Sequence, residues 1–433
     1  MDLTSAVRSP GYLKLLIFAA LIGIPVSLAA MAFITVVQAA ENWLWHDLPT
    51  ALGTTAPPWW LVIAIPLVAG VFVALARKLP GDGGHHPLLG FAGGTTTPKM
   101  LPSVILAAFF TLAAGIVLGP EAPLVAIGGG LALLFGAKAA KGNPQTAQML
   151  TMCGAFAAIS AIFGNPLAAA ILLVEAMALG GEMLTIVLLP GLLSSGVGYL
   201  VFTGVGAWTG LDAPSLSLPT DPPGGVPTAW AVLWAVLIGA VVALLMVGIR
   251  RVGELIEGVA KKVNTLVMLP VCGALVGALA VAYNLLTGDT VADVLFSGET
   301  STATLGAKGA TTAALTLLAL ALFKSVAYAV SLGSGFRGGP VFPSLFIGAT
   351  VGMLAGVTLP GMSPLAGFSA GMAAGTASML RLPLSALVIV GLLTGAAGLQ
   401  VLPIAIIAVV VAVVVRAFTD KNDPAVKAAP HPA

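Results

Sequence analysis

The sequence predicts an all-α protein that crosses the membrane many times, and three observations lead to this fold class. The 433 residues are 58% hydrophobic and 8% charged, with a mean hydropathy of +1.07, whereas a soluble domain carries about 25% charged residues. Apolar stretches recur from one end of the chain to the other. Backbone polar groups in lipid must pair internally, and the alternating segments of a membrane barrel are missing from the sequence, so the apolar stretches are expected to be helices. The composition excludes a soluble enzyme, and the net charge of +2 offers no electrostatic surface for nucleic acid.

The expected helices fall into two groups by length. Full spans need about 20 residues, and apolar runs of this kind lie at 12–38, 59–76, 101–118, 184–202, 228–249, 265–286, 311–330 and 400–418. Shorter runs bounded by Gly and Pro lie at 123–136, 148–162, 166–179, 341–358, 364–379 and 384–398. Membranes tolerate short or broken helices where these are buried in protein or line a cavity, so we expect an internal site built from the second group.

Charged residues predict the orientation and the division of the chain. Lys and Arg flank the span ends, whereas the connections 39–58 and 203–227 carry acidic residues without Lys or Arg. The positive-inside rule therefore places both termini in the cytoplasm, in what we expect to be a bacterial inner membrane. The Pro- and Gly-rich stretch 203–227 becomes an extracellular linker between a first half, 1–202, and a second half, 228–418, and residues 419–433 form a short cytoplasmic tail.

The two halves contain a repeated motif. GPEAPLVAIGG begins at Gly119 and GPVFPSLFIGA begins at Gly339, an offset of 220, and the PLAA at Pro166 matches the PLSA at Pro383 at an offset of 217. Because the chain starts inside and the linker lies outside, each half crosses an odd number of times and the second half is inverted. Inverted repeats with broken helices at matching positions are typical of transporters, whose binding site lies near the midplane.

Each repeated motif has the residues of a helix start. Proline loses nothing in the first turn of a helix, and glycine allows close approach of a ligand. A helix N-terminus has unpaired N–H donors and about half a positive charge, so two such ends would bind an anion without a buried Lys or Arg, which would hold the ion too tightly for flux. The alternative is that Gly-Pro only breaks the helices for packing.

Glu121 lies inside the first motif. An ionised carboxylate at a helix N-terminus competes with a mobile anion for the same donors, and a protonated one leaves. Glu121 is therefore a candidate gate and a candidate proton carrier. A helix-start glutamate that only favours the helix dipole is the alternative, but an intramembrane carboxylate is functional by default.

Four motifs in order resemble the CLC family of chloride channels and chloride/proton antiporters. They are GPEAPLVAIGG (119–129), FGNPLAAAILLVE (163–175), FKSVAYAVSLGSGFRGGPVFP (323–343) and GTASMLRLPLSALVIV (375–390). The resemblance runs from about residue 12 to 418. It implies a CLC-type fold of about 18 helices in two inverted repeats with broken helices meeting at the midplane, and a homodimer with one pore in each subunit.

The resemblance also implies roles for individual residues. Glu121 falls on the gating glutamate of the family, and backbone groups of Val341 and Phe342 fall where the anion binds. The anion-binding residues implied by the matching motifs are Gly119, Ala122, Gly339, Val341, Phe342, Gly81, Asp82 and Gly83.

Three departures from the family pattern are visible. Asp82 replaces an anion-binding serine, so its carboxylate turns away, is protonated, serves an unusual anion, or only caps a helix. His85 and His86 are candidate pH sensors or solvated side chains. Pro340 removes one N–H donor, and the last helix, 400–418, lacks the tyrosine that contacts the central anion in the family.

Proton coupling is less clearly indicated. Ala176 occupies the position at which antiporters of the family carry a second, cytoplasmic glutamate, and Glu175 and Glu182 are nearby candidates for an internal proton relay. Glu175 is alternatively a helix-end residue. Loss of the relay is typical of a channel or an uncoupled transporter.

The sequence therefore predicts passage of a small inorganic anion, most simply chloride, with or without protons, through a lipid-embedded homodimer. Export of fluoride or another anion is the alternative within the family. A membrane-embedded enzyme that uses Asp82, His85 and His86 is a different class, but these residues are an incomplete metal set, and adjacent helical residues do not share a face. No cofactor, metal or nucleic-acid partner is expected.

Overall fold

The computed structural model describes residues 7–90, 96–137, 143–178, 181–209 and 227–420, and within these ranges the chain is helical apart from its connections. The all-α prediction is confirmed. Nine helices of the described ranges are long and apolar enough to cross a membrane, which agrees with an integral, multi-pass protein.

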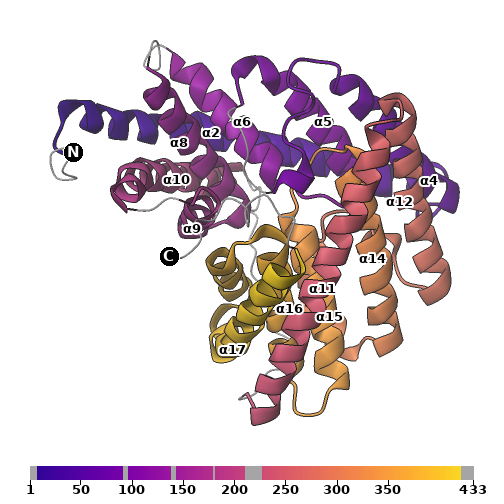
Figure 1. The fold of residues 1–433 in the computed structure, drawn as a ribbon. Helices are drawn as coiled ribbons and strands as arrows, with labels where there is room; N and C mark the ends of the chain where they lie inside the picture. The colour runs from indigo at the N-terminus through magenta and orange to yellow at the C-terminus, as the bar shows by residue number, and fades with distance from the viewer. Residues whose placement is uncertain (1–6, 91–95, 138–142, 179–180, 210–226, 421–433) are drawn as a thin grey trace.

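The first half contains two long helices, one at Pro10–Asn42 and one at Gly181–Thr209, and several shorter ones (Figure 1). In chain order the helices are α2 (Pro10–Asn42), a π-helical turn η1 (Trp43–Asp47), α3 (Leu48–Ala51), α4 (Trp59–Ala76), the 3-10 turns η2 (Pro87–Leu89) and η3 (Pro98–Met100), α5 (Leu101–Ala113), α6 (Glu121–Phe135), α8 (Pro144–Phe163), α9 (Pro166–Ala176) and α10 (Gly181–Thr209). Because α10 continues to Thr209, the helix extends beyond the expected start of the linker at 203, and residues 210–226 lie outside the described ranges.

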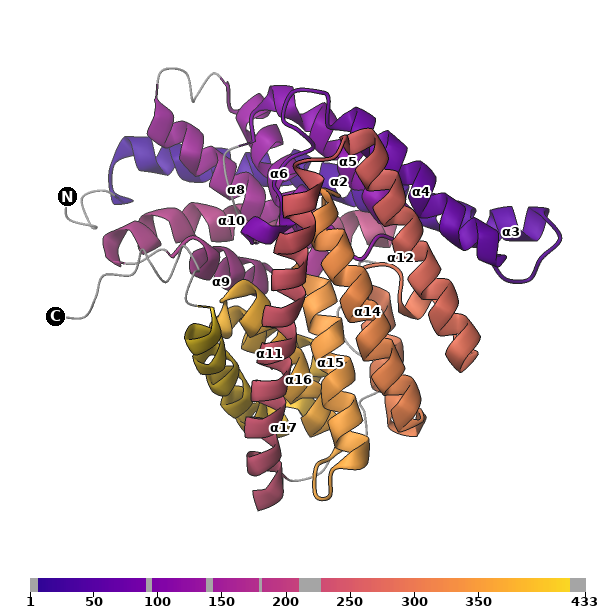
Figure 2. The ribbon, with the colours of Figure 1, turned by 45° about the vertical axis from the view of Figure 1, so that its right-hand side comes forward.

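The second half forms a bundle beside the first, as both views show (Figures 1 and 2). Its helices are α11 (Ala229–Ala260), α12 (Thr265–Thr287), the turn η4 (Val291–Asp293), α13 (Glu299–Lys308), the turn η5 (Gly309–Thr311), α14 (Ala314–Ser334), α15 (Val341–Thr358), α16 (Pro364–Leu380) and α17 (Pro383–Thr419). Most of the expected tail, 421–433, lies outside the described ranges.

Several expected helices have different bounds, and four of the runs differ for a local reason. The run 101–118 is helical only to Ala113, because Gly115 adopts a left-handed φ of +74° that ends the helix. The run 148–162 is longer than expected, because α8 starts at Pro144 with the Asn143 side chain accepting hydrogen bonds from the first-turn N–H groups. The runs 384–398 and 400–418 join into α17, which is interrupted by the non-helical Gly395.

Helix starts repeat along the chain with the offset of the sequence motifs. The helices α6 and α15 begin at residues 121 and 341, and α8 and α16 begin at 144 and 364, so both pairs are 220 residues apart. The helices α9 and α17 begin at 166 and 383, which are 217 residues apart. The repeated motifs are therefore parts of repeated helical units.

Glycine faces hold the broken helices together. A Cβ at Gly348 or Gly352 of α15 would overlap the backbone oxygen of Gly371 or Gly367 in α16, so the two helices touch backbone to backbone. Such contacts need small residues, because lipid gives apolar side chains no reason to associate. This packing fixes α15, and with it the second Gly-Pro motif, in the protein interior.

Candidate functional site

The two Gly-Pro motifs meet in the middle of the molecule through a single antiparallel bridge. The Gly119 N–H donates to the Gly339 oxygen at 2.7 Å, and the Gly339 N–H donates to the Gly119 oxygen at 2.5 Å. Each residue of this pair is the counterpart of the other in the repeat, and a mutual exchange of hydrogen bonds between counterparts is the arrangement that a local two-fold relation produces. The bridge brings the starts of α6 and α15 together.

Both helices begin directly after the bridge. Pro120 and Pro340 are the N-cap residues, and neither has a side chain that accepts a hydrogen bond from the first turn. Ala122, Val341 and Phe342 in these first turns are 5%, 0% and 1% exposed. Two helix N-termini thus point their unpaired donors into the protein interior, where each carries partial positive charge.

Glu121 connects the two helix starts. Its side chain is fully buried, and its Oε1 atom accepts a hydrogen bond of 2.8 Å from the Phe342 N–H in the first turn of α15. Its Oε2 atom has no hydrogen-bond partner among the described residues. A carboxylate from the first half therefore occupies the anion-binding end of a helix from the second half.

Two aromatic side chains make contacts at the start of α15. The Tyr328 hydroxyl in α14 donates to the Pro340 oxygen at 3.0 Å, and the Phe342 ring stacks on Phe163 with centroids 5.7 Å apart. Sequence reasoning missed Tyr328, although a buried tyrosine hydroxyl requires a partner and this is the single tyrosine in the 323–343 motif. It stiffens the turn that presents the α15 donors.

A cavity of 340 Å³ reaches the same turn from one side. Its lining includes Leu118 and Pro120 of the first motif together with Glu41 of α2 and Glu299 of α13. Burial raises the pKa of Glu299 to about 7, and its carboxylate lies close enough to that of Glu121 for the two to repel. Neither Glu41 nor Glu299 belongs to a motif, so the sequence carried no signal for this acidic lining.

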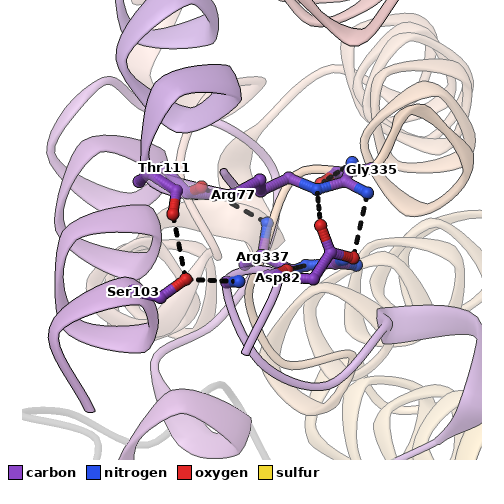
Figure 3. Close-up of polar contacts among 8 residues, drawn as sticks. Arg77, Asp82, Ser103, Thr111, Gly335 and Arg337 are labelled. Carbon is purple, nitrogen blue, oxygen red and sulfur yellow. Dashed lines mark hydrogen bonds and ion pairs between the residues drawn. The ribbon is translucent and has the colours of Figure 1, made fainter. Parts of the chain in front are cut away.

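Asp82 lies in a separate cluster of charged side chains at the C-terminal end of α4 (Figure 3). Its Oδ1 atom is 2.9 Å from Arg77 Nε, and its Oδ2 atom is 3.1 Å from Arg77 Nη2 and 2.5 Å from Arg337 Nη2. Gly81, Asp82 and Gly83 all have positive φ, and the Gly83 N–H donates to Ser103 Oγ at 2.7 Å. The helix-cap alternative for Asp82 is wrong, because the N-cap of η2 is His86 and the Asp82 carboxylate is committed to the two guanidinium groups.

The surroundings of the two histidines favour their neutral form and argue against a sensor near neutral pH. Burial and the nearby Arg337 charge lower the pKa of His85, and the same causes lower the pKa of His86 to about 4. His86 Nδ1 instead accepts a hydrogen bond from the Leu88 N–H. Within the described ranges no group of three His, Cys, Asp or Glu side chains is arranged to hold a metal, so the Asp82, His85 and His86 set has no support as a metal site.

Glu175 caps a helix of the other half. Its carboxylate accepts hydrogen bonds from the Leu384 N–H at 2.9 Å, the Ser385 N–H at 2.7 Å and the Ser385 hydroxyl at 2.5 Å, all at the start of α17. Glu182 falls in the first turn of α10, and its side chain lies outside the described part of the structure. The contacts of Glu175 are those of a helix cap, and the role of Glu182 stays a prediction.

The sequence matches the family described as voltage gated chloride channel over residues 85–417. The chain belongs to the CLC family. This family transports anions across membranes, so the protein is a transport protein rather than an enzyme, and the resemblance drawn from the four motifs is confirmed.

Relatives and solved structures agree with CLC membership. The chain is 29% identical to the "Putative ion-transport protein YfeO" of Salmonella newport and of Salmonella typhimurium, over 80% of this chain and 81% of each relative. Its fold is similar to that of a slow cyanobacterial Cl⁻/H⁺ antiporter (TM-score 0.75, 20% identity, 95% of this chain and 96% of that one). It is also similar to a CLC-type fluoride/proton antiporter (TM-score 0.69, 20% identity, 93% and 94%). These CLC structures share the fold of the chain.

Proposed function

We propose that the protein passes a small monovalent anion, most simply chloride, between the N-termini of α6 and α15, and that Glu121 gates this passage. The observation that carries the proposal is the fully buried Glu121 carboxylate, which accepts a hydrogen bond from the Phe342 N–H. The carboxylate holds a donor that a mobile anion needs. The site contains partial helix charges instead of a full cation, and weak binding of this kind permits release.

Protonation is the step that opens this gate. The neutral carboxyl group is a poorer acceptor and no longer attracted by the helix charge, so it leaves the α15 terminus and frees the Phe342 N–H for the anion. The cavity next to Pro120 lies beside this turn, and its lining includes the carboxylates of Glu299 and Glu41. If the Glu121 carboxyl group carries its proton across the gate, anion flux is coupled to proton movement.

The inner proton relay is not built on Glu175. Its two oxygens accept three hydrogen bonds at the α17 terminus, which favours a fixed helix cap over a mobile carrier. A channel, or a transporter with weak coupling, is therefore the form of transport that these contacts favour. The homodimer, the cytoplasmic termini and the bacterial inner membrane belong to the same proposal.

The test is anion efflux from proteoliposomes with simultaneous recording of the external pH. For the wild-type protein, flux should rise as the pH falls, by about tenfold per pH unit over the range in which the ionised gate dominates, because the protonated fraction changes by that factor. Glu121→Gln imitates the protonated gate and should reduce this dependence to less than about twofold between pH 5 and pH 8. Chloride, fluoride, nitrate and bromide are compared in the same vesicles.

The control is Glu254→Gln, which neutralises a carboxylate paired with Arg250 on α11, 3.0 Å away. Its pH dependence should match the wild type. Unchanged pH dependence in Glu121→Gln would remove Glu121 from the gate. Anion flux without any change in external pH would identify a channel, whereas proton movement driven by the anion gradient would identify an antiporter.

A further inference from the structure

Lys324 is a fully buried lysine in the middle of α14, and the proposed anion passage assigns it no role. Its side chain is 0% exposed, and its Nζ atom binds four consecutive backbone oxygens, those of residues 293–296, at distances of 2.8 Å to 3.4 Å. The same atom lies 4.5 Å from the centroid of the Phe346 ring in α15. A buried ammonium group is costly unless it is hydrogen-bonded. These contacts therefore tie the lysine firmly to the 293–296 turn.

The turn forms one wall of the 340 Å³ cavity beside the gate. Phe296 lines this cavity, and its N–H donates to the Gly115 oxygen at 2.8 Å. Its ring makes an edge contact with Trp45, with centroids 5.5 Å apart. Three residues later, Glu299 lines the same cavity, close enough to Glu121 for the two carboxylates to repel. The turn therefore determines where the Glu299 charge lies relative to the gate.

The backbone of the turn is in a conformation that needs support. Phe296 has a φ of +61°, which a bulky residue adopts only where the surrounding contacts enforce it. A Cβ at Gly298 would lie 2.7 Å from the Cβ of Phe346, so the chain after the turn packs directly on α15. Without the Lys324 ammonium group, Phe296 can relax towards an ordinary conformation. Glu299, three residues further on, would then move with it.

One face of α14 contacts three segments around the gate. Lys324, Tyr328 and Ser331 are spaced by four and three residues, and side chains at this spacing share a helix face. The Tyr328 hydroxyl donates to the Pro340 oxygen at 3.0 Å, and the Ser331 hydroxyl accepts from the Val117 N–H at 3.3 Å. Lys324 makes the third contact, with the cavity wall. This face therefore fixes both Gly-Pro motifs and the cavity wall relative to one another.

The charged neighbours of the turn do not replace Lys324. Its Nζ atom forms no ion pair with a carboxylate in the described part of the chain, although Asp293 is close enough to attract it. The titratable groups around the turn and the cavity, apart from Glu121 and Glu299, are Tyr283, Asp289, Asp293, Lys308, Glu41 and His46. The charged residues of α11 flank Gly253, which packs against Leu332, about two turns beyond Lys324. Among the described side chains, Lys324 is thus the donor that holds the 293–296 oxygens.

We propose that Lys324 is a positioning residue of the gate, which fixes the 293–296 turn and so holds the Glu299 carboxylate beside Glu121. It acts through Glu299 rather than by touching the gate. A negative charge held beside Glu121 favours the neutral, open form of the gate, because two neighbouring carboxylates repel when both are ionised. When the turn is released, Glu299 moves away and the gate opens only at lower pH. This inference rests on the proposed function, but the opening of the turn can be measured without transport.

The first experiment is anion efflux from proteoliposomes as a function of pH. Lys324→Met removes the ammonium group and keeps an unbranched apolar side chain. We expect the midpoint of the flux profile to fall by about 0.5 to 1 pH unit, which is about threefold to tenfold less flux at a pH above the midpoint. Glu299→Gln should shift the midpoint in the same direction, and Lys324→Met should add no further shift to it, because both changes remove one interaction.

Two more variants separate positioning from general damage to the fold. Lys324→Arg keeps the cation and its donors and should restore most of the wild-type profile. Lys324→Gln keeps one donor for the turn and should shift the midpoint in the direction of Lys324→Met but less, so it provides the test if Lys324→Met does not fold. Lower flux at every pH with an unmoved midpoint would overturn the proposal, and so would additive shifts in the double variant.

The second experiment measures the turn itself in the purified, full-length protein in detergent. Val294 is 0% exposed, so a cysteine at this position reacts with a thiol reagent when the turn opens. Lys324→Met should speed the labelling of Val294→Cys by at least about tenfold if opening of the turn limits the reaction. The native Cys153 and Cys272 are buried elsewhere and serve as internal controls.

The matched control is Lys308→Met, which neutralises an exposed lysine at the far end of α13 and should leave the labelling rate and the flux midpoint unchanged. An unchanged labelling rate in Lys324→Met would overturn the proposal. Faster labelling with a wild-type midpoint would overturn it as well, because the turn would then move without affecting the gate. Faster labelling in a protein that passes no anion in vesicles would support the hold of Lys324 on the turn and contradict the proposed function.

Discussion

Glu121 and Asp82 are both carboxylates of the first half that bind a donor of the second half, Asp82 with Arg77 of its own half in addition, but the donors are of different kinds. Glu121 is fully buried and accepts from the neutral N–H of Phe342, whereas Asp82 is 59% exposed and pairs with two guanidinium groups. In the proposed gate, the buried carboxylate without a cation is released when it takes up a proton. An exposed carboxylate between two cations is held by ion pairs that solvent weakens. The comparison suggests two physical solutions to one requirement, which is to hold a negative charge without trapping it.

The two solutions depend on burial in opposite ways. In a buried site a full cation would bind an anion strongly, since the surrounding dielectric constant is low, so helix ends are sufficient at Glu121. At Asp82 solvent weakens each ion pair. Two guanidinium groups are therefore needed to fix the Asp82 carboxylate as firmly as the helix end fixes Glu121. Substitutions that displace or neutralise one of these carboxylates therefore test the comparison.

The largest expected effect comes from displacing Glu121 without changing its charge. A Cβ at Gly339 would overlap the Glu121 carboxylate and lie 3.1 Å from the Ala122 nitrogen. Gly339→Ala should therefore push the carboxylate away from the Phe342 N–H and raise anion flux at pH 7.5 towards the Glu121→Gln value, by about tenfold if pH 7.5 is about one pH unit above the midpoint of the gate. Flux from proteoliposomes at pH 5 and pH 7.5 measures this.

The matched control for this prediction is Gly391→Ala on α17, because a Cβ at Gly391 meets nothing within 4 Å. It should leave flux and its pH dependence unchanged. Gly119→Ala provides a second variant, since its Cβ would also meet the Glu121 carboxylate. Folded Gly339→Ala and Gly119→Ala proteins with wild-type pH dependence would contradict the role of the Phe342 contact.

A third carboxylate, Glu175, gives a smaller expected effect. Glu175→Gln keeps one oxygen acceptor at the start of α17 but loses the second acceptor and the negative charge beside the helix terminus. We expect a loss of about 1 kcal/mol of stability, as for other helix caps, and no change in the ratio of protons to anions transported. Thermal unfolding in detergent and the external-pH recording measure the two quantities.

Ser385→Ala is the matched control for Glu175, because it removes only the hydroxyl that donates to the same carboxylate. Its stability should fall less than that of Glu175→Gln. A lost proton-to-anion coupling in Glu175→Gln, with normal stability, would return Glu175 to the role of an internal relay.

The fold and the meeting of the two motifs were predictable because their signals are local or repeated. Gly-Pro is compatible with a helix start, and the offset of 220 identified Gly119 and Gly339 as counterparts. Apolar length identified the helices, although α8 begins earlier than hydropathy suggests, because the polar residues after Asn143 are compatible with a helix. The CLC resemblance, drawn from motifs in order, is confirmed by the family match.

The contacts of Asp82 could not be predicted, for a physical reason. Arg77 is five residues away, but Arg337 is 255 residues away and reaches Asp82 only because two irregular loops fold together. Loop geometry with left-handed residues has no periodic signal in a sequence. The same holds for Glu41 and Glu299, which come from separate helices and share a cavity lining only in the folded protein.

The smallest expected effect concerns acid stability on the Asp82 side. The pKa of His86 is lowered to about 4 by burial, with Arg337, Arg77 and His85 adding to the shift and Glu257 opposing it. In the unfolded chain the imidazole takes up a proton near pH 6.5, so the unfolded state binds more protons than the folded state between about pH 6.5 and pH 4. Stability from this group is therefore present above pH 6.5 and is lost as the pH falls towards 4.

His86→Gln should remove this contribution, so that thermal stability in detergent falls less between pH 7.5 and pH 5 than in the wild type, by on the order of 1 kcal/mol after allowance for partial exposure. His46→Gln, at an exposed position of η1, should retain the wild-type acid dependence. Glu121→Gln should change the pH dependence of flux but leave the His86 difference intact, since the two groups belong to different clusters. If His86→Gln loses as much stability on acidification as the wild type, burial and the charges of Arg77 and Arg337 do not keep His86 neutral in the folded protein.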